Sequence, residues 1–216
     1  MPKYLNTSLA KTISVVFHPL LMPTLLLGVL FLVAPSCVGV AILKIPTRLS
    51  LLSLIFINTF LVPALLIYYF YRVGLVKSLQ LESLPDRRLP YFTTALIYAL
   101  SSYFFGKMMG GISEIAPQIG TILASIASSV FLVGIVSLQW QISAHAVGMS
   151  GVLGSISGFI IKFGENLLLY PLIGLVVLSG YVLAARLQLN AHTPAQVQVG
   201  FGLGFGVGLI AVLAFI

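Results

Sequence analysis

The stretch 167-LLLYPLIGLVVLSGYVLAA-185 contains no charged residue, and a second uncharged run, 194-PAQVQVGFGLGFGVGLIAVLAFI-216, follows directly after 186-RLQLNAHT-193. An α-helix rises 1.5 Å per residue, so about 20 apolar residues cross the ~30 Å hydrocarbon core of a bilayer. Both runs are therefore predicted to be transmembrane helices. The polar segment between them is predicted to lie at a membrane surface.

The composition of the whole chain agrees with this interpretation. Of the 216 residues, 59% are hydrophobic and 7% are charged, and the mean hydropathy is +1.13. A water-soluble domain has a charged fraction nearer a quarter. We therefore predict an all-α integral-membrane helical bundle that forms a single polytopic domain over residues 1–216.

The charged and metal-binding residue types narrow the function. The net charge of +7 comes from only eleven Lys and Arg, which suits anionic lipid headgroups or phosphates and is too sparse for a nucleic-acid groove. Cys37 is the single cysteine, so the chain forms no internal disulfide and no multi-cysteine metal cluster. Three histidines and four carboxylates leave few ways to build a metal site, and we predict no metal and no cofactor.

Apolar runs of spanning length recur along the chain and predict about six or seven transmembrane helices. The first run follows Lys3 and Lys11 as a signal peptide would, but it is long enough to span, so it is predicted to be a membrane helix. The fifth run has the weakest hydropathy and is rich in glycine, which is typical of a buried span. The expected spans are 13–33, 50–72, 91–109, 118–139, 145–163, 167–185 and 194–216.

Glycines at 200, 204 and 208 form a small-residue ridge on one face of the last predicted helix. Such a ridge allows close approach of another helix backbone. Packing within the chain is the preferred interpretation, and a homo-oligomer formed through this glycine-rich helix is the alternative.

Seven spans would bring the second, fourth and sixth connections between them to one side of the membrane. Those connections hold most of the polar residues that suggest chemistry, although these are scattered over more than a hundred positions: Lys77, Asp86, Arg87, Arg88, Ser143, His145, Arg186 and His192. The other side carries Lys44, Arg48, Lys107, Glu114, Lys162 and Glu165, which are expected to be boundary anchors. The first side carries seven Lys and Arg residues, including Lys3 and Lys11, and the other side carries four, which by the positive-inside rule makes the first side cytoplasmic. If Arg87, Arg88 and Arg186 are left out as phosphate-binding residues, each side carries four. The orientation in the membrane therefore stays open.

Three segments on the first side contain the residue types that phosphate-ester hydrolysis requires: 77-KSLQLESLPDRRLPY-91, 143-SAHAVG-148 and 186-RLQLNAHTPAQ-196. Arg or Lys can hold the phosphate oxygens, one His can act as nucleophile, and another can protonate the leaving group. Thr193 and Pro194 predict a helix start, which places His192 at a helix N-terminus favourable to phosphate. Gln196 lies one turn further along the same face.

The segments resemble signatures of the type 2 phosphatidic acid phosphatase superfamily, which includes the vanadium haloperoxidases. Ser143-Ala144-His145 is similar to P-S-G-H, and Arg186-x5-His192-x3-Gln196 is similar to S-R-x5-H-x3-D. The signature K-x6-R-P is matched loosely by Lys77, Arg87, Arg88 and Pro90. The resemblance covers roughly residues 77–204, which implies a phosphatase-like core over about 77–216, and it is closest to divergent bacterial members, which implies a bacterial cytoplasmic membrane.

The resemblance implies a role for each matching residue. His192 would take the phosphoryl group as phosphohistidine, and His145 would protonate the leaving alkoxide and then activate water. Arg186 and Arg88 would hold the phosphate oxygens, helped by Ser143 and by Lys77 or Arg87. The scheme needs no metal, and the implied partner is a membrane lipid phosphate or pyrophosphate.

Departures from the signatures leave a second function open. Gln196 replaces the family's aspartate and can orient His192 without adding charge, while Asp86 is the acid expected to substitute if the fold brings it near. The alternative is a degenerate member that binds an anionic lipid headgroup without hydrolysis. A transporter or channel ranks last, because few ionisable residues fall at mid-bilayer. His18 matches no signature and is expected to be mainly structural, near Pro19, with an additional place in the pocket as the alternative.

Overall fold

The computed structural model describes residues 6–81 and 83–216, and throughout these ranges the chain forms helices, turns and loops without a strand. The predicted all-α fold class is confirmed. Lys3, which entered the orientation count, lies outside the described residues. The helices are α1 Thr7–Val16, η1 Pro19–Leu21, α2 Met22–Val33, η2 Pro35–Val38, α3 Ile45–Phe56, η3 Ile57–Leu61, α4 Val62–Arg72, α5 Leu84–Tyr103, η4 Phe104–Met108, α6 Gly111–Ile115, α7 Gln118–Val136, α8 Ala144–Phe163, η5 Asn166–Leu168, α9 Leu169–Gln188 and α10 Pro194–Phe215.

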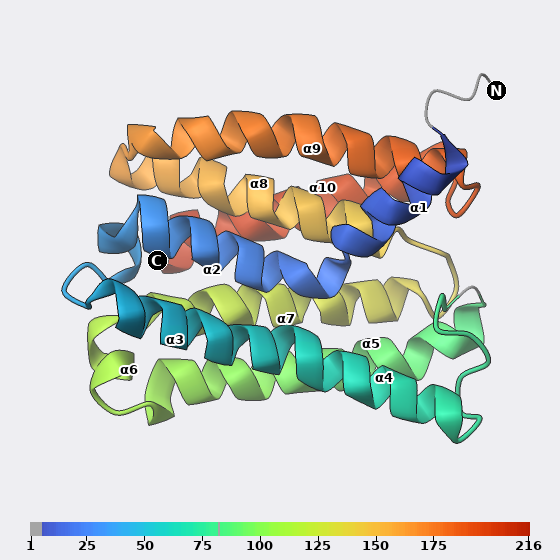
Figure 1. Cartoon of the computed structure of the whole chain (residues 1–216), viewed down its shortest axis with the longest axis horizontal. Helices are drawn as coiled ribbons and strands as arrows, with labels where there is room; N and C mark the ends of the chain where they lie inside the picture. The colour runs from blue at the N-terminus through green and yellow to red at the C-terminus, as the bar shows by residue number, and fades with distance from the viewer. Residues whose placement is uncertain (1–5, 82) are drawn as a thin grey trace.

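Within the described part of the chain, six helical segments are long and apolar enough to cross a membrane, so the protein is an integral membrane bundle. The seventh predicted span, 91–109, falls in α5 and η4, which are not among the six. Asp86, Arg87 and Arg88 in the first turns make α5 less apolar than the others. The helix nevertheless runs the length of the bundle beside α7 (Figure 1). The six segments are Thr7–Val33, Ile45–Arg72, Gln118–Val136, Ala144–Phe163, Asn166–Gln188 and Pro194–Phe215.

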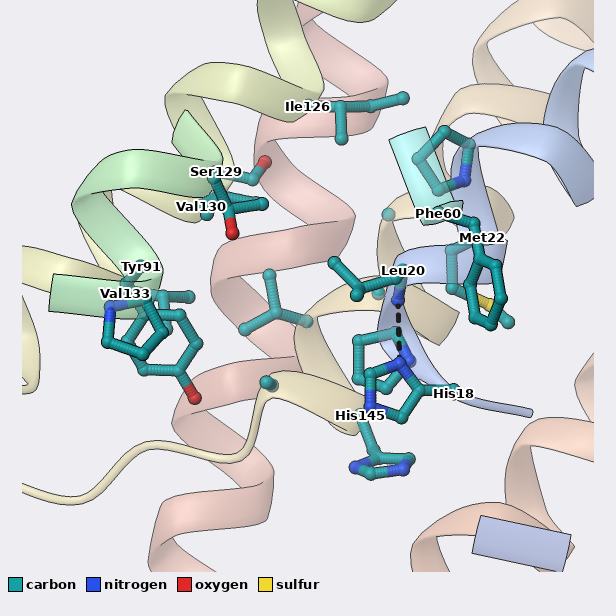
Figure 2. Close-up of a pocket in the computed structure, with 18 of the residues that line it drawn as sticks. His18, Leu20, Met22, Phe60, Tyr91, Ile126, Ser129, Val130, Val133 and His145 are labelled. Carbon is teal, nitrogen blue, oxygen red and sulfur yellow. Dashed lines mark hydrogen bonds between the residues drawn. The ribbon is translucent and has the colours of Figure 1, made fainter. Parts of the chain in front are cut away.

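The first segment is broken between α1 and α2. Proline has no N–H to continue a helical ladder, and α1 ends at Val16, ahead of Pro19. The Nδ1 atom of His18 then accepts a hydrogen bond of 3.3 Å from the backbone N–H of Leu20 and caps the short helix η1. The break turns His18 toward the interior of the bundle, where Figure 2 shows it.

The connections that follow α4, α7 and α9 lie at one end of the bundle, together with the start of α1 (Figure 1). We call this the loop end. The expected convergence of these distant polar segments is therefore found. It arises because α5 crosses the bundle and so preserves the alternation of direction, even though it is the least apolar of the long helices.

Four helices that start at the loop end are capped by side chains. Ser83, Ser143 and Thr193 each accept a hydrogen bond from the backbone N–H three residues further on, at the starts of α5, α8 and α10, and Asn6 accepts from that of Ser8 at the start of α1. Among the described residues, no side chain caps the starts of α3, α7 and α9 at the other end. The positive ends of four helix dipoles therefore gather at the loop end.

Glycines allow α8 and α10 to pack closely in the middle of the bundle. A Cβ added to Gly204 would meet the carbonyl oxygen of Val147, and one added to Gly208 would meet that of Gly151. The predicted ridge on the last helix is thus covered by α8 of the same chain. A homo-oligomer through this helix stays a prediction.

Two basic residues at the opposite end bind backbone carbonyls. Arg48 donates hydrogen bonds to the carbonyls of Leu43, Phe31 and Ala41, and Lys162 donates to those at the end of α10. Helix ends leave such carbonyls without intrahelical partners. Arg48 and Lys162, which were expected to be boundary anchors, therefore also bind backbone carbonyls at the ends of α2 and α10 and in the loop before α3.

Candidate functional site

A cavity of about 510 Å³ opens among the helices toward the loop end. It is lined by Arg87, His145, Arg186 and His192, which come from α5, α8, α9 and the connection before α10. Four residues that the sequence singles out are therefore brought together from positions a hundred residues apart. None of the described residues that line the cavity is Asp or Glu.

His192 is held by one hydrogen bond that fixes its tautomer. The Oε1 atom of Gln196 lies 3.2 Å from Nδ1 of His192 and also accepts from the backbone N–H of Thr193 at 3.1 Å, within the capping box of α10. A carbonyl oxygen only accepts, so Nδ1 must carry the proton. In the neutral ring the lone pair is then on Nε2, which is the nitrogen that a nucleophile requires.

The surroundings of His192 keep its ring neutral. Burial and then the positive charges of Arg87 and Arg186 lower the pKa of His192 from 6.5 to about 4, and the hydrogen bond to Gln196 opposes them. The side chain is 8% exposed, so it reaches solvent through the cavity rather than at the open surface. At neutral pH the Nε2 lone pair is therefore free.

Two guanidinium groups face the cavity. Arg87 is 5% exposed and is fixed by hydrogen bonds from Nε to the carbonyl of Leu81, at 2.7 Å, and from Nη1 to that of Ile142, at 3.1 Å. The Nε atom of Arg186 is buried and has no hydrogen-bond partner among the described residues. Placing the buried Arg87 beside the half-buried Arg186 without a carboxylate among the described lining residues is costly, and a bound anion would relieve that cost.

Arg88 and Lys77 lie outside the cavity. Arg88 donates a long hydrogen bond of 3.4 Å to the carbonyl of Leu138, in the loop after α7, and the side chain of Lys77 is exposed. From the sequence, Arg186 and Arg88 were expected to hold the phosphate oxygens, with Arg87 in a supporting role. In the structure, Arg87 and not Arg88 lines the cavity. Consecutive residues on a helix point about 100° apart, so only one of the two arginines can face inward.

Ser143 and Asp86 support the site without lining it. Ser143 is fully buried, caps α8, and donates its backbone N–H to the carbonyl of Gln196 at 3.4 Å, which ties the start of α8 to that of α10. The carboxylate of Asp86 accepts from the backbone N–H of Lys77 and from the hydroxyl of Ser83. Asp86 therefore belongs to the start of α5, and the described partner that orients His192 is Gln196.

His145 is the second imidazole of the cavity, in the first turn of α8. Its Nε2 atom lies 2.9 Å from the carbonyl oxygen of Ser14 in α1. Because that oxygen only accepts, Nε2 carries the proton, and in the neutral ring Nδ1 holds the lone pair. His145 and His192 are close enough to interact electrostatically.

Several residues that line the cavity were not assigned to the site from the sequence. Figure 2 shows Tyr91 on the wall opposite His18 and His145, and Ser14 contributes from α1. Tyr91 interacts electrostatically with Arg186. The signal in the sequence is helical phase, because Tyr91 lies four residues after Arg87 on the same face of α5. Nothing in the sequence indicates that α1 reaches α8.

The rest of the cavity is mostly apolar, with hydroxyl groups at Thr94, Ser125, Ser129 and Ser155, and it extends into the bundle. Along α5 it is lined from Arg87 to Tyr98, and the eleven steps of 1.5 Å between these residues span about 16 Å. Side chains from the first two membrane segments and from α7 complete the wall, among them Leu26, Phe60 and Ile126. A polar chamber at the loop end thus continues into an apolar chamber within the membrane region.

The described side chains do not form a metal site: within residues 6–81 and 83–216 no three His, Cys, Asp or Glu residues are grouped as ligands. Comparisons with protein-family models, with curated proteins and with solved structures give no match to this chain. Any assignment of function therefore rests on the residues that meet in the cavity.

Proposed function

We propose that the protein is a membrane phosphatase that hydrolyses a lipid phosphate or pyrophosphate through a phosphohistidine at His192. The observation that carries the proposal is the His192 ring itself, whose Nδ1–H is held by Gln196 and whose Nε2 is free in a cavity with two arginines. This arrangement is that of an oriented nucleophile beside a binding site for anionic oxygens.

The electrostatics of the cavity support binding of phosphate. Arg87 and Arg186 face it, α8 and α10 begin beside it, and its described lining contains no carboxylate. Helix N-termini and guanidinium groups both favour phosphate oxygens. The lone Nε–H of Arg186, buried without a partner among the described residues, provides one donor for such an oxygen.

The tautomers give a balanced reaction. Nε2 of His192 attacks phosphorus, the bond from phosphorus to the leaving oxygen breaks, and that oxygen takes a proton from Nδ1 of His145. His145 must enter this step as an imidazolium, which the negative charge of the bound phosphate stabilises. Water then attacks the phosphohistidine, its proton returns to Nδ1 of His145, and inorganic phosphate leaves with His192 restored. The carbonyl of Ser14 holds the Nε2–H of His145 throughout.

The apolar chamber favours a lipid over a soluble phosphate. Most of its wall is apolar, as at Leu26, Phe60 and Ile126, and its few Ser and Thr hydroxyls offer few partners for a sugar or nucleoside. An acyl or prenyl chain that enters it buries apolar surface at about 25 cal/mol per Å². A substrate with a phosphate head and an apolar tail matches both halves of the cavity.

Gln196 favours one alternative, a protein that binds an anionic headgroup without turnover. A neutral amide stabilises the developing imidazolium less than a carboxylate would, and neutralising the corresponding acid in a catalytic triad lowers kcat by about 10⁴. In the enzyme, Gln196→Glu keeps an oxygen that can accept from both His192 and Thr193, so we expect it to raise turnover. In the binding protein the same change adds negative charge and weakens headgroup binding.

The test is release of inorganic phosphate by the detergent-purified protein, without added metal, from a panel of lipid phosphates and pyrophosphates. We expect release from at least one lipid, and loss of release in His192→Ala with the helical content unchanged. Equal turnover in that variant would rule out His192 as nucleophile. A folded wild-type protein that binds phosphatidic acid but releases no phosphate would favour the binding alternative.

A further inference from the structure

His18 is not required by the proposed chemistry, yet its imidazole lies in the same cavity. Its ring is 6.0 Å from that of His145, centroid to centroid, in an edge-to-face arrangement at 72°, and 6.4 Å from the ring of Phe60 (Figure 2). His18 also interacts electrostatically with Arg186. It comes from the break in the first membrane segment, more than a hundred residues from every other histidine.

The helix cap fixes which nitrogen of His18 carries the proton. The backbone N–H of Leu20 donates to Nδ1 of His18 at 3.3 Å, so Nδ1 holds a lone pair and Nε2 carries the hydrogen. Protonation of Nδ1 would remove the cap. His18 is therefore a neutral, permanent donor through Nε2 and is unsuited to transfer a proton.

The two neighbouring rings are complementary in hydrogen bonding. His18 offers a donor at Nε2, and His145, whose Nε2–H is held by Ser14, offers a lone pair at Nδ1. An oxygen bound to two nitrogens at about 2.9 Å from each holds them up to roughly 6 Å apart. The centroids of the two rings are 6.0 Å apart, so one oxygen atom can lie within hydrogen-bonding reach of both rings.

A cap alone does not account for an imidazole at this position. Asn, Asp and Ser are the preferred capping residues, and each would accept from Leu20 without filling the cavity. A histidine adds a second hydrogen-bonding edge, and that edge lies in the cavity beside the residue to which the proposed function gives the leaving-group proton.

We propose that His18 is a further catalytic residue, whose Nε2–H donates a hydrogen bond to the oxygen that leaves phosphorus and then to the water that replaces it. The inference rests on the proposed function. In the first step this donor stabilises the negative charge that develops on the leaving oxygen while His145 supplies the proton. In the second step it orients water toward phosphorus while His145 accepts the proton. His18 keeps its own proton in both steps.

The test compares His18→Asn with His18→Ala in the full-length protein in detergent, with the wild type beside them. Asn retains an oxygen that can cap Leu20 but has no donor that extends as far as Nε2. We expect His18→Asn to keep the thermal stability of the wild type and its inhibition by inorganic phosphate. We expect its kcat/KM for phosphatidic acid to fall by about 10²-fold, the effect of losing one oriented donor.

A substrate with a stable leaving group separates a catalytic role from a structural one. The leaving oxygen of p-nitrophenyl phosphate needs little stabilisation, so we expect His18→Asn to lower its kcat/KM at least tenfold less than that of phosphatidic acid. Equal losses on both substrates, or full activity of His18→Asn with both, would overturn the inference and leave His18 as a cap only. If the wild type releases phosphate from neither substrate, the proposed function itself fails and the role of His18 with it.

Discussion

Arg87 and Arg88 are neighbours in the sequence with different surroundings, and they form a matched pair for mutation. Arg87 is buried at the cavity and Arg88 is exposed near Leu138. We expect Arg87→Ala to lower kcat/KM about 100-fold or more, since a donor aimed at transition-state charge contributes 10²–10³. We expect Arg88→Ala to stay within about threefold of the wild type, because exposed charges contribute little.

Arg87 also holds two loop carbonyls, so the comparison needs a structural control. Inhibition by inorganic phosphate should weaken in Arg87→Ala and persist in Arg87→Lys, which keeps the charge. Losses of the same size in Arg87→Ala and Arg88→Ala would contradict the placement of Arg87 as the phosphate ligand. The thermal unfolding midpoint of each variant shows whether the loss reflects unfolding.

The depressed pKa of His192 predicts the acid limit of activity. The reactive ring is neutral, so kcat/KM should fall as the pH drops through about 4, where His192 becomes protonated. A bound phosphate counters Arg87 and Arg186 and raises this pKa, so the acid limb of kcat should lie at a higher pH than that of kcat/KM. An acid limb at or above pH 6 in kcat/KM would contradict the neutral, buried state of the free ring.

The same titration links His192 to stability. The pKa is about 4 in the folded protein and near 6.5 when the chain is unfolded. The unfolded state therefore binds the proton first, and stability falls as the pH decreases from 6.5 to 4. His192→Asn lacks this titration, so its unfolding midpoint should decrease less than that of the wild type between pH 7 and pH 4.5.

Among the helices, the contact of α8 with α10 offers a second matched pair. Gly204 has no room for a Cβ between Val147 and Ser150, whereas Gly202 has no atom within 4 Å of an added Cβ. Both changes to Ala improve helix propensity by about 1 kcal/mol. We expect Gly204→Ala to lower the unfolding midpoint by several degrees because the backbones must separate. Gly202→Ala should equal or exceed the wild type, and equal midpoints for the two variants would contradict the close packing.

Hydropathy predicted the long helices because the length and the apolar character of a membrane span are both properties of one continuous stretch of sequence. Their ends were harder to predict. The helix expected from residue 13 begins at Thr7, since Asn6 accepts from the backbone N–H of Ser8 and caps it. The one expected from residue 50 begins at Ile45, with Pro46 in its first turn. Local capping decides these positions, and hydropathy does not report it.

The site was predictable where its residues share a segment. The four-residue spacing of His192 and Gln196 predicts one helix face. The two side chains are in contact, but His192 lies just before Thr193, the N-cap of α10, and not on the helix itself. Whether Arg87 or Arg88 faces the cavity depends on how α5 is rotated about its axis relative to α7 and α8, and no local sequence pattern determines that rotation. His18 is an isolated histidine in an apolar run, and its neighbour His145 becomes apparent only once α1 is placed.

Across the whole molecule, one alternation of direction brings the starts of α5, α8 and α10 to the loop end (Figure 1). The arginines and imidazoles line the cavity there, and the cavity continues into a mostly apolar part of the bundle. Under the proposed function, this arrangement would place the phosphate group at a membrane surface and the tail of the substrate within the membrane. The N-terminal segment contributes to both parts, since α1 holds His145 through Ser14 and α2 lines the apolar chamber.

The most direct measurement is to trap the intermediate. The purified protein is mixed with phosphatidic acid carrying a radioactive phosphoryl group, quenched in alkali, in which phosphohistidine is stable, and the labelled residue is identified by peptide mass spectrometry. We predict label on His192 that disappears with the release of inorganic phosphate and is absent from His192→Ala. Turnover without label on His192, or label on His145 instead, would contradict the assignment of His192 as the nucleophile.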